Sequence, residues 1–111
     1  MPTGSSPNQG PLHSTFAGDP DMGELIAEFA GEMPSRVEAL ESVAQAGSID
    51  DLQRLAHQLK GAGAGYGFEP VSSAAARLEN RLRALEGDER TLASVGEELR
   101  SLIETCRRVT I

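Results

Sequence analysis

The sequence predicts an all-α protein, an antiparallel up-down four-helix bundle. Apolar residues recur at spacings of three and four along four segments, which is the pattern of amphipathic helices. No segment of useful length alternates apolar and polar residues with the period of two that is typical of strands. The breaks between the four segments are short, so neighbouring helices are expected to run antiparallel.

The first helix is expected to begin at Asp19-Pro20, where an N-cap residue precedes a proline at the first helical position. Pro34 lies inside the apolar pattern and has no backbone N–H, so we expect a long helix that is kinked at this residue. Gly47 is expected to end the helix. Its apolar face consists of Ile26, Phe29, Met33, Val37, Leu40 and Ala44.

Three further helices are expected. The second starts at Ser48, which forms an S-x-x-D capping-box pattern with Asp51. The third starts at Glu69-Pro70, and the fourth follows a stop and a new cap at Gly87-Asp88. Their apolar faces are Leu52, Leu55, Ala56, Leu59, Gly63 and Tyr66; Val71, Ala74, Ala75, Leu78, Leu82 and Leu85; and Leu92, Val95, Leu99, Leu102, Cys106 and Val109.

Length and composition limit the function classes. The 111 residues suit one domain, with residues 1–18 as a mostly disordered N-terminal lead and residues 19–111 as the bundle. Leu12 and Phe16 could attach the end of this lead to the domain. A formal net charge of −7 argues against nucleic acid or an anionic membrane as the partner. The chain has no secretory signal pattern, no long apolar run and only one cysteine, which together predict a cytoplasmic protein.

His57 is the candidate functional residue. At about 100° per residue it points roughly 160° away from the apolar face of the second helix, towards solvent. Arg54 and Lys60, the only lysine, lie three residues before and after it, while Gly61 and Ala64 share its stripe. An exposed imidazole is largely neutral at pH 7 and therefore nucleophilic. If it accepted a phosphoryl group, Lys60 would offset the added charge, and the small residues would leave room for a second protein.

The glycines that follow His57 do not fit a nucleotide-binding loop. A P-loop needs its lysine directly after the second glycine, whereas Lys60 precedes the glycines, and no window reads G-x-G-x-x-G. We interpret Gly63 and Gly65 as allowing close helix packing and the end of the second helix. Two distant histidines and Cys106 offer too few ligands for zinc, so no metal or cofactor is expected.

The stretch A-H-Q-L-K-G-A-G-A-G-Y-G-F, from Ala56 to Phe68, resembles the histidine-containing phosphotransfer (HPt) domain, together with R-L-E at Arg77 to Glu79. That family is an antiparallel helical bundle with the pattern H-x-x-K-G, small residues and a later glycine. The resemblance extends over roughly residues 20–108 and includes Phe29, Pro34, the Asp50-Asp51 pair and Ala56.

The resemblance implies a phosphocarrier. His57 would accept a phosphoryl group from the aspartate of a receiver domain, or from a sensor kinase, and pass it to another receiver. Lys60 would steady the phosphoryl oxygens, and Gly67 would serve the turn into the third helix. A serine that is common after the motif glycine is Ala62 here, so a hydroxyl contact is expected to be absent. The expected docking surface consists of Gln53, Arg54, Gly61 and Ala64.

The expected partners are receiver domains and hybrid sensor histidine kinases. Mg²⁺ would sit in the receiver, so the chain would need no cofactor of its own. One bundle leaves no room for an ATP-binding domain, so the protein is expected to be a monomeric carrier and not a kinase. Whether it stands alone or belongs to a larger kinase stays open.

Two alternatives belong to other function classes. The first is a helical interaction module that docks receiver domains without carrying phosphate, against which the presence of both His57 and Lys60 argues. The second is an enzyme that uses His57 as a general base, but the sequence places no second titratable group beside the histidine.

Overall fold

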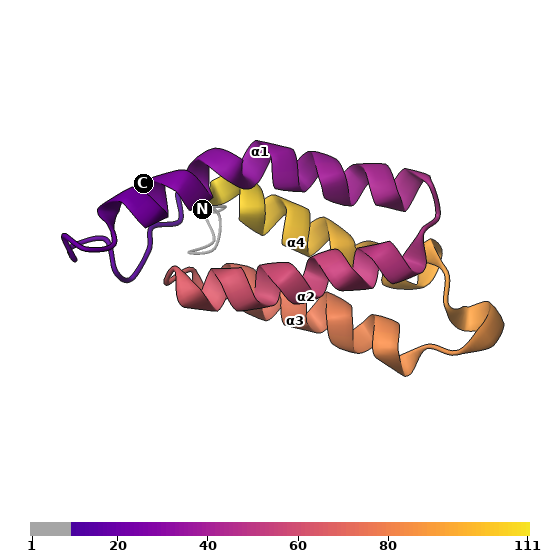
Figure 1. Ribbon diagram of the computed structural model, residues 1–111. Helices are drawn as coiled ribbons and strands as arrows, with labels where there is room; N and C mark the ends of the chain where they lie inside the picture. Colours follow the sequence, from indigo (N-terminus) through magenta and orange to yellow (C-terminus); the bar gives the residue numbers. More distant parts are fainter. Residues whose placement is uncertain (1–9) are drawn as a thin grey trace, which may run out of the picture.

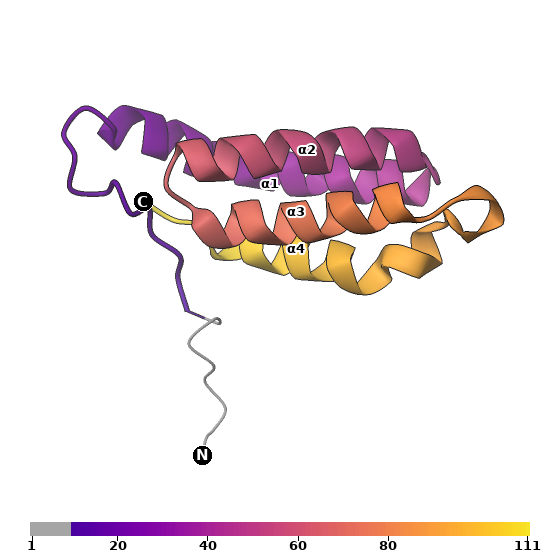
Figure 2. The ribbon, with the colours of Figure 1, turned by 90° about the horizontal axis from the view of Figure 1, so that it is seen from below.

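A computed structural model describes residues 10–111 and shows four helices packed as a bundle (Figures 1 and 2). The all-α four-helix class that the sequence predicts is confirmed. Two short 3₁₀ turns lie between the third and fourth helices. The elements are α1 (Gly23–Gln45), α2 (Ile49–Gly65), α3 (Glu69–Ala84), η1 (Gly87–Glu89), η2 (Leu92–Val95) and α4 (Gly96–Arg108).

The core is built from the predicted apolar faces. Phe29 of α1 is buried in this core and packs against Tyr66 and Phe68, with ring centroids 5.0 and 5.4 Å away. Leu55, Tyr66, Leu92 and Val109 were expected in the core and are only partly buried. A charged residue, Glu79 of α3, is also completely buried.

The start of α1 differs from the expectation. The helix begins at Gly23 and not at Asp19-Pro20. Asp19 forms a turn instead: its side chain accepts a hydrogen bond from the Asp21 N–H at 2.9 Å, and its carbonyl accepts one from the Met22 N–H at 3.0 Å. Such local bonds compete with the helix for the same backbone groups. The helix then runs through Pro34 as one element, and a kink there stays a prediction.

The starts of the other three helices agree with the predicted starts only in part. Ser48 does precede α2, but its hydroxyl donates to the Asp51 carboxylate at 2.7 Å and caps no backbone N–H. Helix α3 starts at Glu69, as predicted. The prediction that the fourth helix follows Gly87-Asp88 is wrong, because α4 begins only at Gly96. Arg90 holds the intervening loop against the bundle by donating to the Leu82 carbonyl at 3.3 Å and to side chains of α2.

Residues 10–18 contact the bundle; the rest of the expected lead, residues 1–9, lies outside the described residues. The Leu12 N–H donates to the Arg108 carbonyl at 2.7 Å, which joins this segment to the end of α4. Ser14 is buried, and its hydroxyl donates to the Tyr66 carbonyl at 2.5 Å. The segment therefore bridges the C-terminal end of the chain and the turn between α2 and α3.

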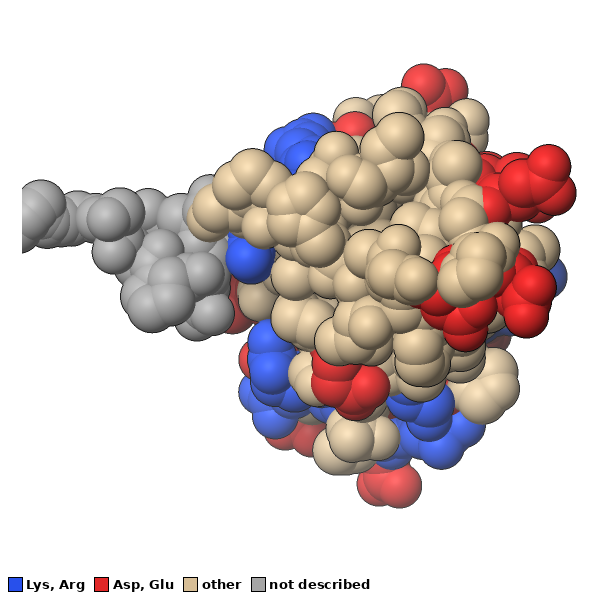
Figure 3. All heavy atoms as spheres, turned by 90° about the vertical axis from the view of Figure 1, so that its left-hand side faces the viewer, with Lys and Arg blue, Asp and Glu red and all other residues tan. Residues whose placement is uncertain are grey.

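The turn between α2 and α3 contains Gly67, whose φ of 81° is one that side-chain-bearing residues rarely adopt. An added Cβ there would also lie 2.6 Å from the Ser14 hydroxyl. Figure 3 looks onto this end of the bundle and shows a broad uncharged area with acidic side chains along one edge. No helix within residues 10–111 combines the length and apolar character needed to cross a membrane.

Candidate functional site

Close packing of α2 against α3 positions the site. At Gly63 an added Cβ would lie only 2.8 Å from the backbone nitrogen of Ser72. The two helices can therefore pack this closely only because Gly63 has no side chain. The Ser72 hydroxyl donates to the Lys60 carbonyl at 2.8 Å and links the helices at the same level. Gly63 has the close-packing role that the sequence predicted, whereas Gly65 has no neighbour within 4 Å of such a Cβ. This contact sets His57 and Lys60 opposite α3.

Glu79 of α3 is the centre of the site. Its carboxylate side chain is 1% exposed and contacts three basic groups. His57 Nδ1 lies 2.7 Å from Oε2, and Arg83 also approaches Oε2 at 2.9 Å. Lys60 Nζ lies 2.8 Å from Oε1 as an ion pair, and no group within residues 10–111 makes a hydrogen bond of good geometry to this buried oxygen. A buried carboxylate is tolerated only when it is paired in this way.

The hydrogen bond from Lys60 is the largest influence on Glu79 and lowers the pKa of its carboxyl below the ordinary value of 4.5, against the opposing effect of burial. Hydrogen bonding by His57 and the positive charge of Arg83 lower this pKa further. Glu79 is therefore ionised at neutral pH, and an ionised carboxylate only accepts hydrogen bonds. In the neutral imidazole the proton of His57 is therefore on Nδ1, where it can be donated to Glu79, and the lone pair is on Nε2. The imidazole is 61% exposed, so this nitrogen is accessible.

A surface hollow of about 290 Å³ adjoins the histidine. It is lined by Asp50, Gln53, Arg54, His57, Glu79 and Arg83. The arrangement places an exposed imidazole beside two cations, Lys60 and Arg83, which are both paired with the buried carboxylate of Glu79.

The predicted site residues lie on α2 as expected, but they differ in exposure and in the groups that they contact. Arg54 is exposed, lines the hollow beside His57 and pairs with Asp51 at 3.0 Å. Gly61 and Ala64 are exposed, and nothing lies within 4 Å of a Cβ added at Gly61. Gln53 is partly buried and accepts a hydrogen bond from Arg90. Lys60 is partly buried against Glu79 and is not a freely solvated cation.

Sequence reasoning assigned no role to Glu79 or Arg83. A signal was present, because Glu79 lies four residues after Ala75 and three before Leu82, both on the apolar face of α3. A carboxylate at a core spacing needs a cationic or hydrogen-bonding partner. Which partner it has depends on how α3 faces α2, which periodicity within one helix does not define.

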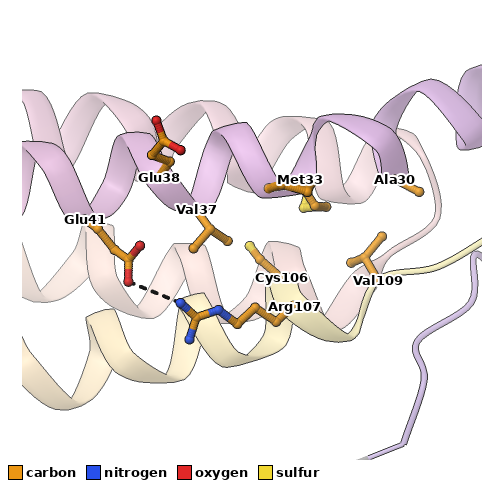
Figure 4. A pocket seen from close by; sticks show the side chains of 9 residues that line it. Ala30, Met33, Val37, Glu38, Glu41, Cys106, Arg107 and Val109 are labelled. Carbon is orange, nitrogen blue, oxygen red and sulfur yellow. Dashed lines mark hydrogen bonds and ion pairs between the residues drawn. The ribbon is translucent and has the colours of Figure 1, made fainter.

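Cys106 lies away from this site. It points into a hollow of about 410 Å³ between α1 and α4, near Met33 and Val37, with the Arg107–Glu41 ion pair at one side (Figure 4). Burial raises the pKa of the thiol to about 11, so it is protonated at neutral pH and behaves as a core residue. Within residues 10–111 no three His, Cys, Asp or Glu side chains are grouped so that they could hold a metal ion.

Comparison with known proteins identifies the family. The family model of the Hpt domain matches residues 24–108, from the first turn of α1 to the end of α4. No curated protein and no solved structure matches the chain. The match covers well over half of the sequence, and the four-helix bundle extends over the same residues. The chain therefore belongs to the Hpt domain family, whose members are histidine phosphotransfer intermediates of phosphorelays and not kinases.

Proposed function

We propose that His57 is the phosphoacceptor of this Hpt domain. It takes a phosphoryl group from a receiver-domain aspartate, or from a sensor kinase, and passes it to the aspartate of another receiver. Hpt domains generally interact with such receivers and kinases. The observation that carries the proposal is the 2.7 Å contact between His57 Nδ1 and buried Glu79, because in the neutral ring it assigns the lone pair to Nε2 while the side chain stays 61% exposed.

In the proposed reaction the Nε2 lone pair attacks the phosphorus of an aspartyl phosphate in line with the leaving oxygen. The N–P bond forms, the P–O bond to the aspartate breaks, and the aspartate leaves as a carboxylate. No proton needs to leave the ring, because Nδ1 keeps its hydrogen bond to Glu79. The charge of Glu79 stabilises the cationic phosphoimidazole ring, as a carboxylate orients and stabilises histidine in other nucleophilic sites.

Lys60 and Arg83 supply the positive charge that the phosphoryl oxygens need. Both contact Glu79 and flank the histidine, Lys60 from α2 and Arg83 from α3. Transfer of a phosphoryl group depends mostly on positioning and charge neutralisation. Mg²⁺ is assigned to the acidic pocket of the receiver. The exposed stripe of Arg54, Gly61 and Ala64, with Gln53 beside it, is the proposed docking surface, since its small residues allow close approach.

The test follows labelled phosphate from a phosphorylated receiver domain to this chain. We expect an adduct that is labile in acid and stable in alkali, and that is absent from His57→Gln. His13→Gln, which removes the only other histidine, is the matched control and should accept phosphate like the wild type. Docking without transfer from any receiver would overturn the proposal in favour of a non-phosphorylated interaction module.

A further inference from the structure

We propose that Arg90 and Gln53 form a specificity-determining pair for receiver docking. Arg90 fixes the Gln53 amide so that its N–H donors are presented beside His57, to a hydrogen-bond acceptor on the receiver. This inference rests on the proposed function, because it concerns the partner that approaches His57. Gln53 lies four residues before His57 on α2, so the two side chains are neighbours on one helix surface.

Arg90 is anchored on three sides. Its guanidinium donates to the Leu82 carbonyl at 3.3 Å, to the Asp50 carboxylate at 2.8 Å and to Gln53 Oε1 at 2.5 Å. Its side chain is 27% exposed, whereas that of Asp50 is 90% exposed. One side chain of the loop after α3 thus joins the last turn of α3 to the first two turns of α2.

The chemistry of arginine sets the orientation of the amide. A guanidinium has donors and no acceptor, so only the oxygen of the Gln53 amide can face Arg90. Both N–H groups of this amide are then directed elsewhere, and they form no hydrogen bond within residues 10–111. They are not among the buried polar groups without a partner, so they are accessible to solvent. Gln53 also lines the hollow that holds His57, which places these donors where a docked receiver would meet them.

A fixed Gln53 amide recognises a receiver more selectively than a freely rotating one. A free glutamine on a helix surface can present either its oxygen or its nitrogen and loses rotamer entropy when a partner binds. Arg90 removes that choice, so the surface offers donors only. A receiver is favoured if it presents a carboxylate or carbonyl oxygen to Gln53 while its aspartate meets His57. A receiver that presents a hydrogen-bond donor at the same place is disfavoured.

The decisive variant is Gln53→Glu. It keeps an oxygen for Arg90, so the loop stays anchored, but it replaces the two donors with an acceptor. The measurement is transfer from a receiver phosphorylated with acetyl phosphate, with KM and kcat determined separately. We expect KM to rise about ten-fold, the effect of one lost hydrogen bond to a charged group, with kcat unchanged. Gln45→Glu adds the same charge at the end of α1 and should leave both constants unchanged.

Arg90→Ala tests the positioning role. We expect it to raise KM in the wild-type background and to add nothing further in the Gln53→Glu background, because Arg90 acts through Gln53. An unchanged KM in Gln53→Glu would overturn the proposal. A lower melting temperature with unchanged KM in Arg90→Ala would also overturn it and leave Arg90 as a brace for the loop.

Docking is measured alongside transfer, by titrating the unphosphorylated receiver into the His57→Gln protein with and without Gln53→Glu. A Kd that rises about ten-fold with Gln53→Glu supports the pair whether or not transfer occurs. If the wild type docks but does not transfer, the phosphocarrier proposal fails while the docking result still decides this one.

Discussion

Glu79 determines the geometry at His57. Its carboxylate orients the imidazole through Oε2 and holds Lys60 through Oε1. The same cations that balance Glu79 in the unphosphorylated protein also flank the nitrogen that would carry the phosphoryl group. Lys60 therefore has a structural task in addition to the one inferred from the sequence, since its ammonium group lies 2.8 Å from the buried Oε1, which makes no hydrogen bond of good geometry within the described residues.

Replacement of Lys60 by alanine should show this structural task. The pKa of Glu79 is lowered in the folded protein, chiefly by Lys60. Its ionised form therefore stabilises the fold above the ordinary pKa of 4.5, and this stabilisation is lost as the pH falls through and below that value. We expect Lys60→Ala to lower the free energy of unfolding at pH 7 by about 1–3 kcal/mol, because it removes a cation that balances the charge of a buried carboxylate. We also expect a shallower loss of stability on acidification.

The measurement is urea unfolding of both proteins between pH 3 and pH 7, a range that includes the ordinary pKa of 4.5. Arg54→Ala is the matched control, since it also removes a cation three residues from His57. Within residues 10–111 Arg54 pairs with the partly buried Asp51, one helical turn away on α2, so its loss should cost less than about 0.5 kcal/mol. Equal effects of the two variants would show that Lys60 does not support Glu79.

At the scale of elements, the packing of α2 on α3 brings the site together. His57 and Glu79 are 22 residues apart in the chain and meet because the helices run side by side (Figure 2). Gly63 permits this approach, whereas Gly61, two residues earlier on α2, faces open space. The glycines of this segment thus have different roles, although they look alike in the sequence.

Alanine at these two glycines should have opposite effects. At Gly63 the new Cβ would meet the backbone of Ser72 at 2.8 Å, so the helices must move apart, and we expect a loss of about 1–3 kcal/mol in stability. At Gly61 the Cβ meets nothing, and alanine should stabilise α2 by up to about 1 kcal/mol. Thermal unfolding measures both. A neutral Gly63→Ala would mean that the packing adapts without cost.

At the scale of the whole molecule, the segment before α1 closes one end of the bundle. Leu12 pairs with Val109, and Thr15 donates its N–H to the Gly67 carbonyl at 2.9 Å. The residues before α1, the turn after α2 and the end of α4 therefore form one connected region, and the uncharged face of Figure 3 lies over it.

Ser14 tests how much this closure contributes. Its buried hydroxyl donates to the Tyr66 carbonyl and accepts from the Phe16 N–H at 2.9 Å. We expect Ser14→Ala to destabilise the protein by about 1–2 kcal/mol, because it leaves both backbone groups without this partner. Ser73→Ala, at an exposed position of α3, is the control and should change stability by less than about 0.5 kcal/mol. If both serines respond alike in chemical denaturation, the segment does not stabilise the bundle.

The sequence by itself determined the helical class, most of the core and the exposure of His57. Each of these follows from periodicity within one helix, since the spacing of apolar residues defines which face is buried. The sequence also marked the segment around His57 as resembling the HPt family, which the family match confirms. It placed Lys60 next to the histidine, because a separation of three residues is a neighbour on any helix.

Only the tertiary structure decided what surrounds these residues. The contact of His57 with Glu79, the recruitment of Arg83 and the anchoring of Arg90 on Gln53 all join residues of different elements. The start of α4 also depends on such a contact, because Arg90 holds the loop before α4 against α3. Such contacts depend on how two helices face each other, and the periodicity of each helix defines its buried face but not the partner that covers it.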